Sequence, residues 1–311
     1  MTTLLKGLRD WRSRRRTRAR FRRSYEAFLR NPSRQTTMDA QSLLRNAFLA
    51  TRGECLSWAR ERQRAISPHV PSDVSSPLFP RLSAADIGRA VAALGRDGYF
   101  VMPWRLPPEW IDSVRDALSQ LPAEARGNAG DVQQPARLVP KSATYWHRPG
   151  DLLAVPGLRQ LVDDAAVREI CGRTLGCRPV LDVATAWWSY PTAAADSASA
   201  QKYHYDLDSV RWLKVFVYLN DVTEANGPHA YVRGSHETVG RFVTEDRRYE
   251  DDEVFRWYPR GDEVVFTAPA GTIFFEDTLG FHKGIPVRAG HRAIFECEFS
   301  INHFGYPYPE C

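Results

Sequence analysis

A histidine and two aspartates occupy alternate positions in the stretch YHYDLD, residues 203–208. Side chains at positions i and i+2 of a strand point to the same face, so an extended conformation here would place the imidazole of His204 beside the carboxylate of Asp206. Together these two groups could ligate one metal ion. A polar edge strand facing water would explain the same pattern, and the metal site therefore depends on a third ligand elsewhere in the chain.

His282 is the best candidate for that third ligand. It follows the apolar run GTIFFEDTLGF and lies just before a turn. The other histidines lie in a linker, ahead of the predicted sheet, beside turns or in the aromatic C-terminal stretch, and we rank them lower: His69, His147, His229, His236, His291 and His303. We also expect Asp208 to turn into the loop after the strand rather than to reach the metal.

Arg292 meets a second requirement of the same chemistry. Two histidines and one carboxylate leave an open face on the metal, as in non-haem Fe(II) oxygenases. A 2-oxo acid that chelates this face carries a second, distal carboxylate, which needs a fixed cation. Arg292 opens the apolar strand that follows His282, and its planar guanidinium can bind a carboxylate through two hydrogen bonds. The four residues together are a far more specific signal than His204 and Asp206 alone.

The elements that must position these residues form an α+β domain with a sandwich or barrel core. Helices are predicted over 37–66, 83–98, 107–121 and about 157–175, with a Ser before and a Gly after the second of them. A short strand, YFVMP, lies between two of these helices. Strand patterns then dominate: PVLDVATAWWSY, RWLKVFVYLND, DEVVFTAPAGTIFFED and HRAIFECEFSIN. The adjacent Trp187 and Trp188 in the first of these are expected to fill the core and one surface face.

Composition narrows the class of protein further. The chain has 311 residues, 43% of them hydrophobic, and no apolar run of the length a membrane span needs. Five scattered cysteines argue against a disulfide framework and against a structural zinc cluster, so we expect a reducing, cytoplasmic compartment. The motifs G-x-S-x-G, Walker A and G-x-G-x-x-G are missing, so esterase, NTPase and dinucleotide-binding functions have no support.

The net charge of +5 is concentrated at the N-terminus. Residues 1–35 hold twelve Lys and Arg against Asp10 and Glu26, and the rest of the chain is mildly acidic. We expect residues 1–80 to be a basic helical extension followed by a Pro- and Ser-rich linker, and residues 81–311 to be the oxygenase domain. The basic segment is typical of a helix on an anionic membrane surface, of a nucleic-acid contact or of a transit peptide, and a solvated, partly ordered extension explains it equally well. As a macromolecular partner we expect a membrane surface rather than nucleic acid.

From about residue 83 to 302 the sequence resembles the phytanoyl-CoA dioxygenase family of Fe(II)/2-oxoglutarate oxygenases. The resemblance is carried by LGRDGYFVMPWRLPPEWIDSVRDAL, by the H-x-D at 204–206, by VYLNDVTEANGPHAYVRGSHE and by DEVVFTAPAGTIFFEDTLGFHKG. It implies a double-stranded β-helix, or jelly-roll, core with flanking helices. It also implies that His204, Asp206 and His282 are the iron ligands and that Arg292 binds the far carboxylate of 2-oxoglutarate.

The same resemblance implies the reaction and further cosubstrate contacts. Family members also use upstream polar or aromatic residues for 2-oxoglutarate, and the candidates here are Gln201, Tyr203 and Trp212. The implied cofactors are Fe(II), 2-oxoglutarate and O2, with release of succinate and CO2. Related halogenases replace the carboxylate ligand, so the presence of Asp206 favours hydroxylation of an aliphatic C–H in a small-molecule or lipid-type substrate.

Two further questions stay open in the sequence. The small-residue loop 192–200 and the charged insertion 241–260 border the ligand-bearing strands, and we expect both to lie over the site and to set specificity. A non-catalytic jelly-roll module, tethered to membrane or nucleic acid by its Arg-rich tail, is the alternative function. The four site residues argue against this alternative, because a module that only binds would not need all of them. A zinc hydrolase is disfavoured as well, because Arg292 would have no evident role in it.

Overall fold

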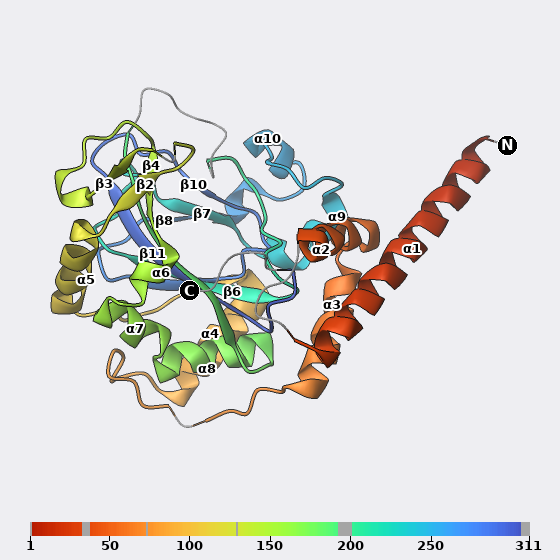
Figure 1. The fold of residues 1–311 in the computed structure, drawn as a ribbon, viewed down its shortest axis with the longest axis horizontal. Coiled ribbons are helices and arrows are strands. Elements are labelled where there is room, and N and C mark those ends of the chain that lie inside the picture. Colours follow the sequence, from red (N-terminus) through yellow and green to blue (C-terminus); the bar gives the residue numbers. More distant parts are fainter. Residues whose placement is uncertain (1, 33–37, 73, 129, 192–200, 306–311) are drawn as a thin grey trace.

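The computed structural model describes the chain except for residues 1, 33–37, 73, 129, 192–200 and 306–311. Two antiparallel sheets form a jelly-roll core (Figure 1), which confirms the predicted fold class. The large sheet has the order β1-β9-β6-β11-β5-β4-β2-β3, and the small sheet the order β10-β7-β8. The strands are β1 (Tyr99–Val101), β2 (Ala123–Ala125), β3 (Val132–Gln133), β4 (Thr144–His147), β5 (Val180–Ser189), β6 (Trp212–Tyr218), β7 (His229–Val232), β8 (Glu263–Phe266), β9 (Ile273–Glu276), β10 (His282–Gly284) and β11 (Arg292–Ser300).

Helices precede the sheets and lie among their connections. They are α1 (Thr2–Arg30), α2 (Met38–Thr51), α3 (Glu54–Ile66), α4 (Ala84–Asp97), α5 (Pro108–Gln120), α6 (Pro149–Leu152), α7 (Pro156–Val162), α8 (Ala165–Leu175), α9 (Val239–Phe242) and α10 (Asp251–Val254). The helix predicted over 83–98 is confirmed: Ser83 and Asp86 form a reciprocal capping box at the start of α4, and Gly98 ends it with a φ of 85°. Among the described residues, no helix has the length and apolarity to cross a bilayer.

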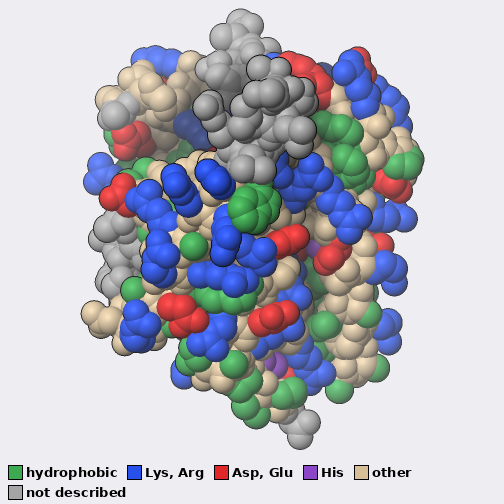
Figure 2. All heavy atoms as spheres, turned by 90° about the vertical axis from the view of Figure 1, so that its right-hand side faces the viewer, with side chains coloured by type: hydrophobic (Ala, Val, Ile, Leu, Met, Phe, Trp, Pro, Cys, Tyr) green, Lys and Arg blue, Asp and Glu red, His purple; other side chains and the backbone are tan. Residues whose placement is uncertain are grey.

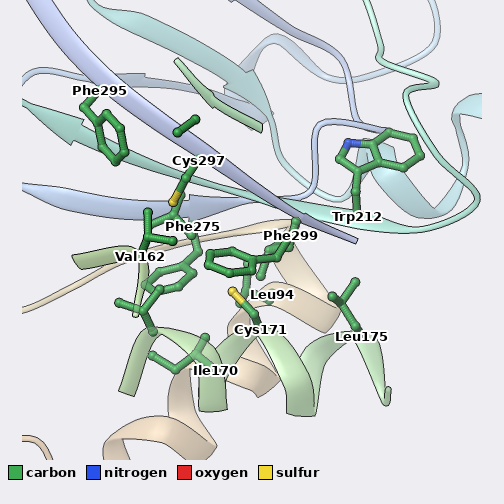
Figure 3. Packing of buried hydrophobic residues seen from close by; sticks show 14 of the residues in the cluster. Leu94, Val162, Ile170, Cys171, Leu175, Trp212, Phe275, Phe295, Cys297 and Phe299 are labelled. Carbon is green, nitrogen blue, oxygen red and sulfur yellow. The ribbon is translucent and has the colours of Figure 1, made fainter. Parts of the chain in front are cut away.

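The outer face of the large sheet is covered by helices (Figure 3). Phe295, Cys297 and Phe299 of β11 pack toward α8, which contributes Ile170 and Cys171. Because side chains alternate along a strand, the intervening residues of β11 must point the other way, into the barrel. Those residues are Arg292, Ile294, Glu296 and Glu298, all buried. Helix packing on one face therefore directs charged side chains into the interior.

Three predicted elements differ from the structure in ways that local geometry explains. The helix predicted over 37–66 is broken between α2 and α3, where Arg52 and Gly53 adopt φ values of 53° and 88°. The helix predicted over 157–175 is divided because Asp164 caps α8 by accepting hydrogen bonds from two backbone N–H groups. The YHYDLD stretch forms bridges only at Tyr203 and His204 and is irregular from residue 205 onward.

The C-terminal half of α1 is part of the core rather than a free extension. Phe21 and Tyr25 are fully buried and pack with Phe304. Asn302 joins this contact by donating hydrogen bonds to the hydroxyl of Tyr25 at 2.8 Å and to Gln63 at 2.9 Å. Helices α1–α3 and the C-terminal segment therefore share one hydrophobic cluster, and the domain boundary predicted at residue 80 stays a prediction.

The N-terminal half of α1 extends past the other helices (Figure 1). The arginines from Arg12 to Arg16 are exposed, as is Trp11 at 57% of its surface. Figure 2 shows Lys and Arg side chains spread over the face of the molecule that carries this helix. Contact of this segment with an anionic membrane surface stays a prediction.

Replacing Tyr25 with Ala should lower the free energy of unfolding of the described core by about 3–5 kcal/mol. The substitution removes a fully buried ring and leaves the Asn302 amide without one of its acceptors. Urea denaturation followed by circular dichroism measures the change. The exposed Trp11→Ala variant is the control and should be neutral. A Tyr25→Ala protein as stable as the control would mean that α1 is a separate extension.

Candidate metal centre

The structure brings the three predicted metal ligands together. The YHYDLD segment lies beside β10, where the backbone N–H of His204 donates to the carbonyl of His282 at 3.0 Å and the reverse bond is 2.9 Å. The backbone N–H of Asp206 donates to Thr278 at 2.8 Å. One ligand atom from each of His204, Asp206 and His282 lies within 4.8 Å of the others. Two backbone pairings thus replace the longer strand that the sequence predicted.

Both imidazoles are oriented for metal binding by backbone carbonyls. Nδ1 of His204 is 3.0 Å from the carbonyl oxygen of Lys202, and Nδ1 of His282 is 3.0 Å from that of Gly280. A proton donated from Nδ1 leaves the Nε2 lone pair free, as in most metal-binding histidines. The two Nε2 atoms lie 4.0 and 3.5 Å from oxygens of Asp206. Burial lowers the pKa of both histidines, so each is neutral and ready to ligate.

Lys214 of β6 neutralises the negative charge around the centre. Its ammonium donates to Oδ2 of Asp206 at 2.8 Å and lies 3.1 Å from Asp208, 3.6 Å from Glu296 and 3.5 Å from Glu298. Burial alone would raise the pKa of Asp206, but Lys214 and the two histidines lower it well below its usual range. Asp208 thus contacts Lys214, and it is not among the grouped metal ligands.

Replacing Lys214 with Met should destabilise the metal-free protein by about 3–5 kcal/mol at pH 7, because the buried carboxylates would lose their shared cation. Burial raises the pKa of Glu296 to about 7 and raises that of Glu298 well above its ordinary value, so protonation should reduce the loss as the pH falls. Urea denaturation at pH 7 and pH 5 tests this. Lys202→Met is the control, because Lys202 pairs with the exposed Glu250, and it should cost about 1 kcal/mol or less. Equal losses in the two variants would contradict the expectation.

Arg292 is a buried cation that lacks a carboxylate partner among the described residues. Its side chain donates to the carbonyl oxygen of Gly227 and, at 3.4 Å, to the hydroxyl of Ser189. Its Nε is buried without a hydrogen-bond partner. Burial lowers the pKa of the guanidinium, which nonetheless stays charged in proteins. A buried, underused guanidinium is the kind of group that the carboxylate of a small ligand would satisfy.

The other three predicted cosubstrate residues are placed differently. The hydroxyl of Tyr203 donates to Glu263, on the face opposite His204. The indole N–H of Trp212 donates to the hydroxyl of Thr278 at 2.8 Å. Neither ring has a donor left for 2-oxoglutarate, because each one is already used within the protein. Gln201 is half-buried at the start of the metal-ligand segment, and its role stays a prediction.

A buried His229–Glu276 pair lies next to the centre and was not identified from the sequence. Nε2 of His229 is 3.0 Å from one carboxyl oxygen of Glu276 and 2.9 Å from the other. The ring of His229 stacks on that of His282, with centroids 5.6 Å apart. His229 adjoins a Gly-Pro turn, and for this reason it was a weak candidate for a metal ligand in the sequence. The acidic residue that ends the apolar run IFFE was the available signal, since burial of that run would carry Glu276 inward.

Between pH 7 and 9 we expect the metal-free protein to lose stability as the pH rises. Burial raises the pKa of Glu276 to about 8 from its ordinary 4.5, so the folded state holds a proton that the unfolded chain has released. One such proton lowers the free energy of unfolding by up to about 1.4 kcal/mol per pH unit. The buried histidines add little slope in this range, because their pKa values are lowered and unfolded histidine is already largely neutral.

Urea denaturation at pH 7, 8 and 9 measures this dependence. The Glu276→Gln variant keeps a polar side chain of the same size that cannot ionise, so its stability should fall less steeply over the same range. A slope unchanged from that of the wild type would show that Glu276 does not titrate there.

Comparisons with known proteins agree with this geometry. Residues 94–293 match the family model described as Phytanoyl-CoA dioxygenase (PhyH). Among solved structures, the chain is similar to SnoN, a non-haem α-ketoglutarate-dependent epimerase from nogalamycin biosynthesis, with a TM-score of 0.52, 17% identity, and coverage of 70% of this chain and 82% of SnoN. The carbocyclase SnoK of the same biosynthesis gives a TM-score of 0.51, 18% identity, and coverage of 73% and 87%. At these identities the two structures show a shared fold. No curated protein sequence matches significantly.

The matched region spans more than half of the chain and contains both sheets of the core, except that only Arg292 and Ala293 of β11 lie within it. All three grouped ligands and Arg292 lie within it. The fold, the family model and the grouping of side chains point to the same class of protein. The chain belongs to the phytanoyl-CoA dioxygenase family.

Proposed function

We propose that the protein is an Fe(II)- and 2-oxoglutarate-dependent dioxygenase that hydroxylates an aliphatic C–H of a small-molecule or lipid-type substrate. The family uses Fe(II), 2-oxoglutarate and O2. The observation that carries the proposal is the combination of two oriented histidines and one carboxylate with a buried arginine that lacks a carboxylate partner among the described residues. A metal site alone would not need Arg292, and an anion site alone would not need the ligand triad.

Each residue has a defined task in this proposal. His204, Asp206 and His282 would hold the iron and leave part of its coordination sphere open. Arg292 and the hydroxyl of Ser189 would receive the distal carboxylate of 2-oxoglutarate. When bound, iron with 2-oxoglutarate and O2 supplies the oxidising power for the C–H bond. The protein keeps the ligands neutral or singly charged, orients Nε2 of each histidine, and excludes water from the buried side of the centre.

Hydroxylation is the finer part of the proposal. The carboxylate position is filled by Asp206, which favours oxygen transfer over halogenation. The epimerase SnoN and the carbocyclase SnoK share the fold at 17% and 18% identity, so the fold does not decide the outcome of the reaction. The product does: hydroxylation adds one oxygen atom that derives from O2, whereas epimerisation and ring closure add none.

The test begins with the visible spectrum of the Fe(II)-loaded protein, mixed anaerobically with 2-oxoglutarate. The Fe(II)–2-oxoglutarate chelate gives a weak charge-transfer band, and its appearance is the expected result. Candidate substrates are then screened for stimulated succinate release, with ¹⁸O2 to label the product. Iron binding without the band would refute 2-oxoglutarate as cosubstrate. If no iron bound at all, the non-catalytic binding module would become the preferred function.

A further inference from the structure

Arg248 lies directly beside the metal ligands. Tyr249 forms an antiparallel bridge with Tyr203, in which its N–H donates to the Tyr203 carbonyl at 2.8 Å. In an antiparallel pair the next residue of one segment faces the preceding residue of the other, so Arg248 is opposite His204 and shares its inward face. Cα atoms of opposite residues are roughly 4.5–5.5 Å apart. Segment 241–260, which was predicted to lie over the site, thus contributes one cationic side chain next to the metal ligands.

Arg126 lies on the large sheet and is exposed. It follows β2, and its backbone N–H donates to the carbonyl of Thr144 on β4 at 2.9 Å. Register then places Thr144 opposite Ser189, and Ser189 opposite Arg292. Arg126 therefore lies at the end of the inward-facing row that contains Arg292. Its guanidinium lies over the ring of Trp146, 5.3 Å from the ring centroid.

Neither arginine forms an ion pair or a side-chain hydrogen bond in the part of the chain that the structure describes. Nη1 of Arg248 is buried without a partner. The two guanidinium groups are near enough to repel each other, and Arg248 also acts on His204 and Asp206. Asp246, the other carboxylate near Arg248, is already paired with Arg45 at 2.6 Å. Arg126 is exposed and Arg248 is half-buried, so an anion bound between them would receive a charge-assisted hydrogen bond from each.

The aromatic surroundings add a third unused donor. Trp146 of β4 stacks on Trp187 of β5 with ring centroids 4.5 Å apart, and both lie on the inward face. The indole N–H of Trp146 is buried and has no partner. Trp187 was predicted to fill the core or an outer face, but register places it in the row next to Ser189 and Arg292. The inward-facing row thus has an aromatic wall, and two buried donors without partners lie near the exposed cation of Arg126.

We propose that the substrate is a small acid whose carboxylate, phosphate or sulfate group is bound between Arg126 and Arg248. This inference rests on the proposed function. Because Arg248 is opposite the metal ligand His204, the bound acid group lies close to the metal, and the oxidised carbon is only a few bonds away from it. Trp146 holds Arg126 in place and supplies a further N–H to the same oxyanion. A neutral or cationic substrate would leave both arginines without a counter-charge.

Phenyl phosphate is a suitable probe, with benzyl alcohol as its neutral counterpart. Calorimetric titration of the metal-free protein should show phenyl phosphate binding at least about tenfold more tightly than benzyl alcohol. Arg126→Gln and Arg248→Gln should each weaken phenyl phosphate binding at least about tenfold, because a charge-assisted bond is lost. Arg247→Gln is the matched control, since Arg247 is already paired with Glu253 at 2.7 Å, and it should bind as the wild type does. Circular dichroism checks that every variant is folded.

Two further measurements separate the substrate from the cosubstrate. Arg292→Gln should leave phenyl phosphate binding unchanged, and the Arg126 and Arg248 variants should form the Fe(II)–2-oxoglutarate band at wild-type affinity. If phenyl phosphate binding depended on Arg292 alone, or if the Arg126 and Arg248 variants lost 2-oxoglutarate affinity, the proposal would be overturned. Absence of the band in the wild type would instead refute the proposed function. The titrations could then still establish an anion site, but that site would have no role in substrate binding.

Discussion

Replacing His282 with Ala is expected to abolish formation of the Fe(II)–2-oxoglutarate chelate. The substitution removes one of three ligand atoms that lie within 4.8 Å of one another. Loss of a residue that merely orients a ligand typically costs about 10–100-fold in metal affinity, so loss of the ligand itself should weaken iron binding by more than about 100-fold. Iron content after desalting and the visible band are the two readouts. Succinate formation should fall to background.

A matched histidine variant serves as the control for this result. His69 pairs with Glu169 at 3.1 Å, close to α8 on the outer side of the large sheet, and His69→Ala should keep both iron and the chelate band. If His282→Ala retained iron at the wild-type ratio, the metal would have to be bound elsewhere and the triad assignment would fail. Loss of iron in both variants would point to general unfolding, which circular dichroism detects.

Replacing Arg292 with Gln is expected to separate iron binding from 2-oxoglutarate binding. The guanidinium is buried and its Nε has no partner, so the distal carboxylate is the interaction it lacks. Losing two charge-assisted hydrogen bonds should cost roughly 3 kcal/mol or more, a factor of about 100 in 2-oxoglutarate affinity. Titration of the chelate band measures this affinity. Iron content should stay at the wild-type level, because Arg292 is not a ligand.

Stability gives a second and independent readout for Arg292. A buried cation without a carboxylate partner is costly, so the free energy of unfolding of the Gln variant in urea should be at least as high as that of the wild type. Arg292→Lys keeps the charge but loses the two-pronged geometry, and its affinity should be intermediate. Wild-type 2-oxoglutarate affinity in Arg292→Gln would remove this residue from the cosubstrate site.

Local patterns in the sequence predicted most of the elements and the grouping of the candidate ligand triad. Alternation of apolar and polar residues predicted the strands, and the Ser83 cap with Gly98 predicted α4, because these signals act over a few residues. The spacing of His204 and Asp206 already implied a shared face, and the structure agrees even though only His204 lies in a bridge. Arg292 was identified from its place at the start of β11 and from the chemistry that a 2-oxo acid requires.

Helix boundaries were less certain because they depend on single backbone conformations. The break between α2 and α3 rests on the positive φ angles of Arg52 and Gly53, and the break before α8 rests on the cap formed by Asp164. Hydrophobic periodicity continues across both breaks, so it could not locate them. The burial of Tyr25 against Phe304 depends likewise on a contact between the two ends of the chain.

The sequence by itself predicted an α+β domain with a sandwich or barrel core and a candidate set of metal ligands, because those follow from residue type, local order and spacing. The family and its jelly-roll class followed from the resemblance of whole segments. Only the tertiary structure decided which inward faces meet. Strand register placed Lys214 among four carboxylates, His229 beside His282, and Arg126 in the row of Arg292. The environment of the iron and the charge of the substrate space depend on pairings between distant segments, and periodicity within one segment carries no information about its partner.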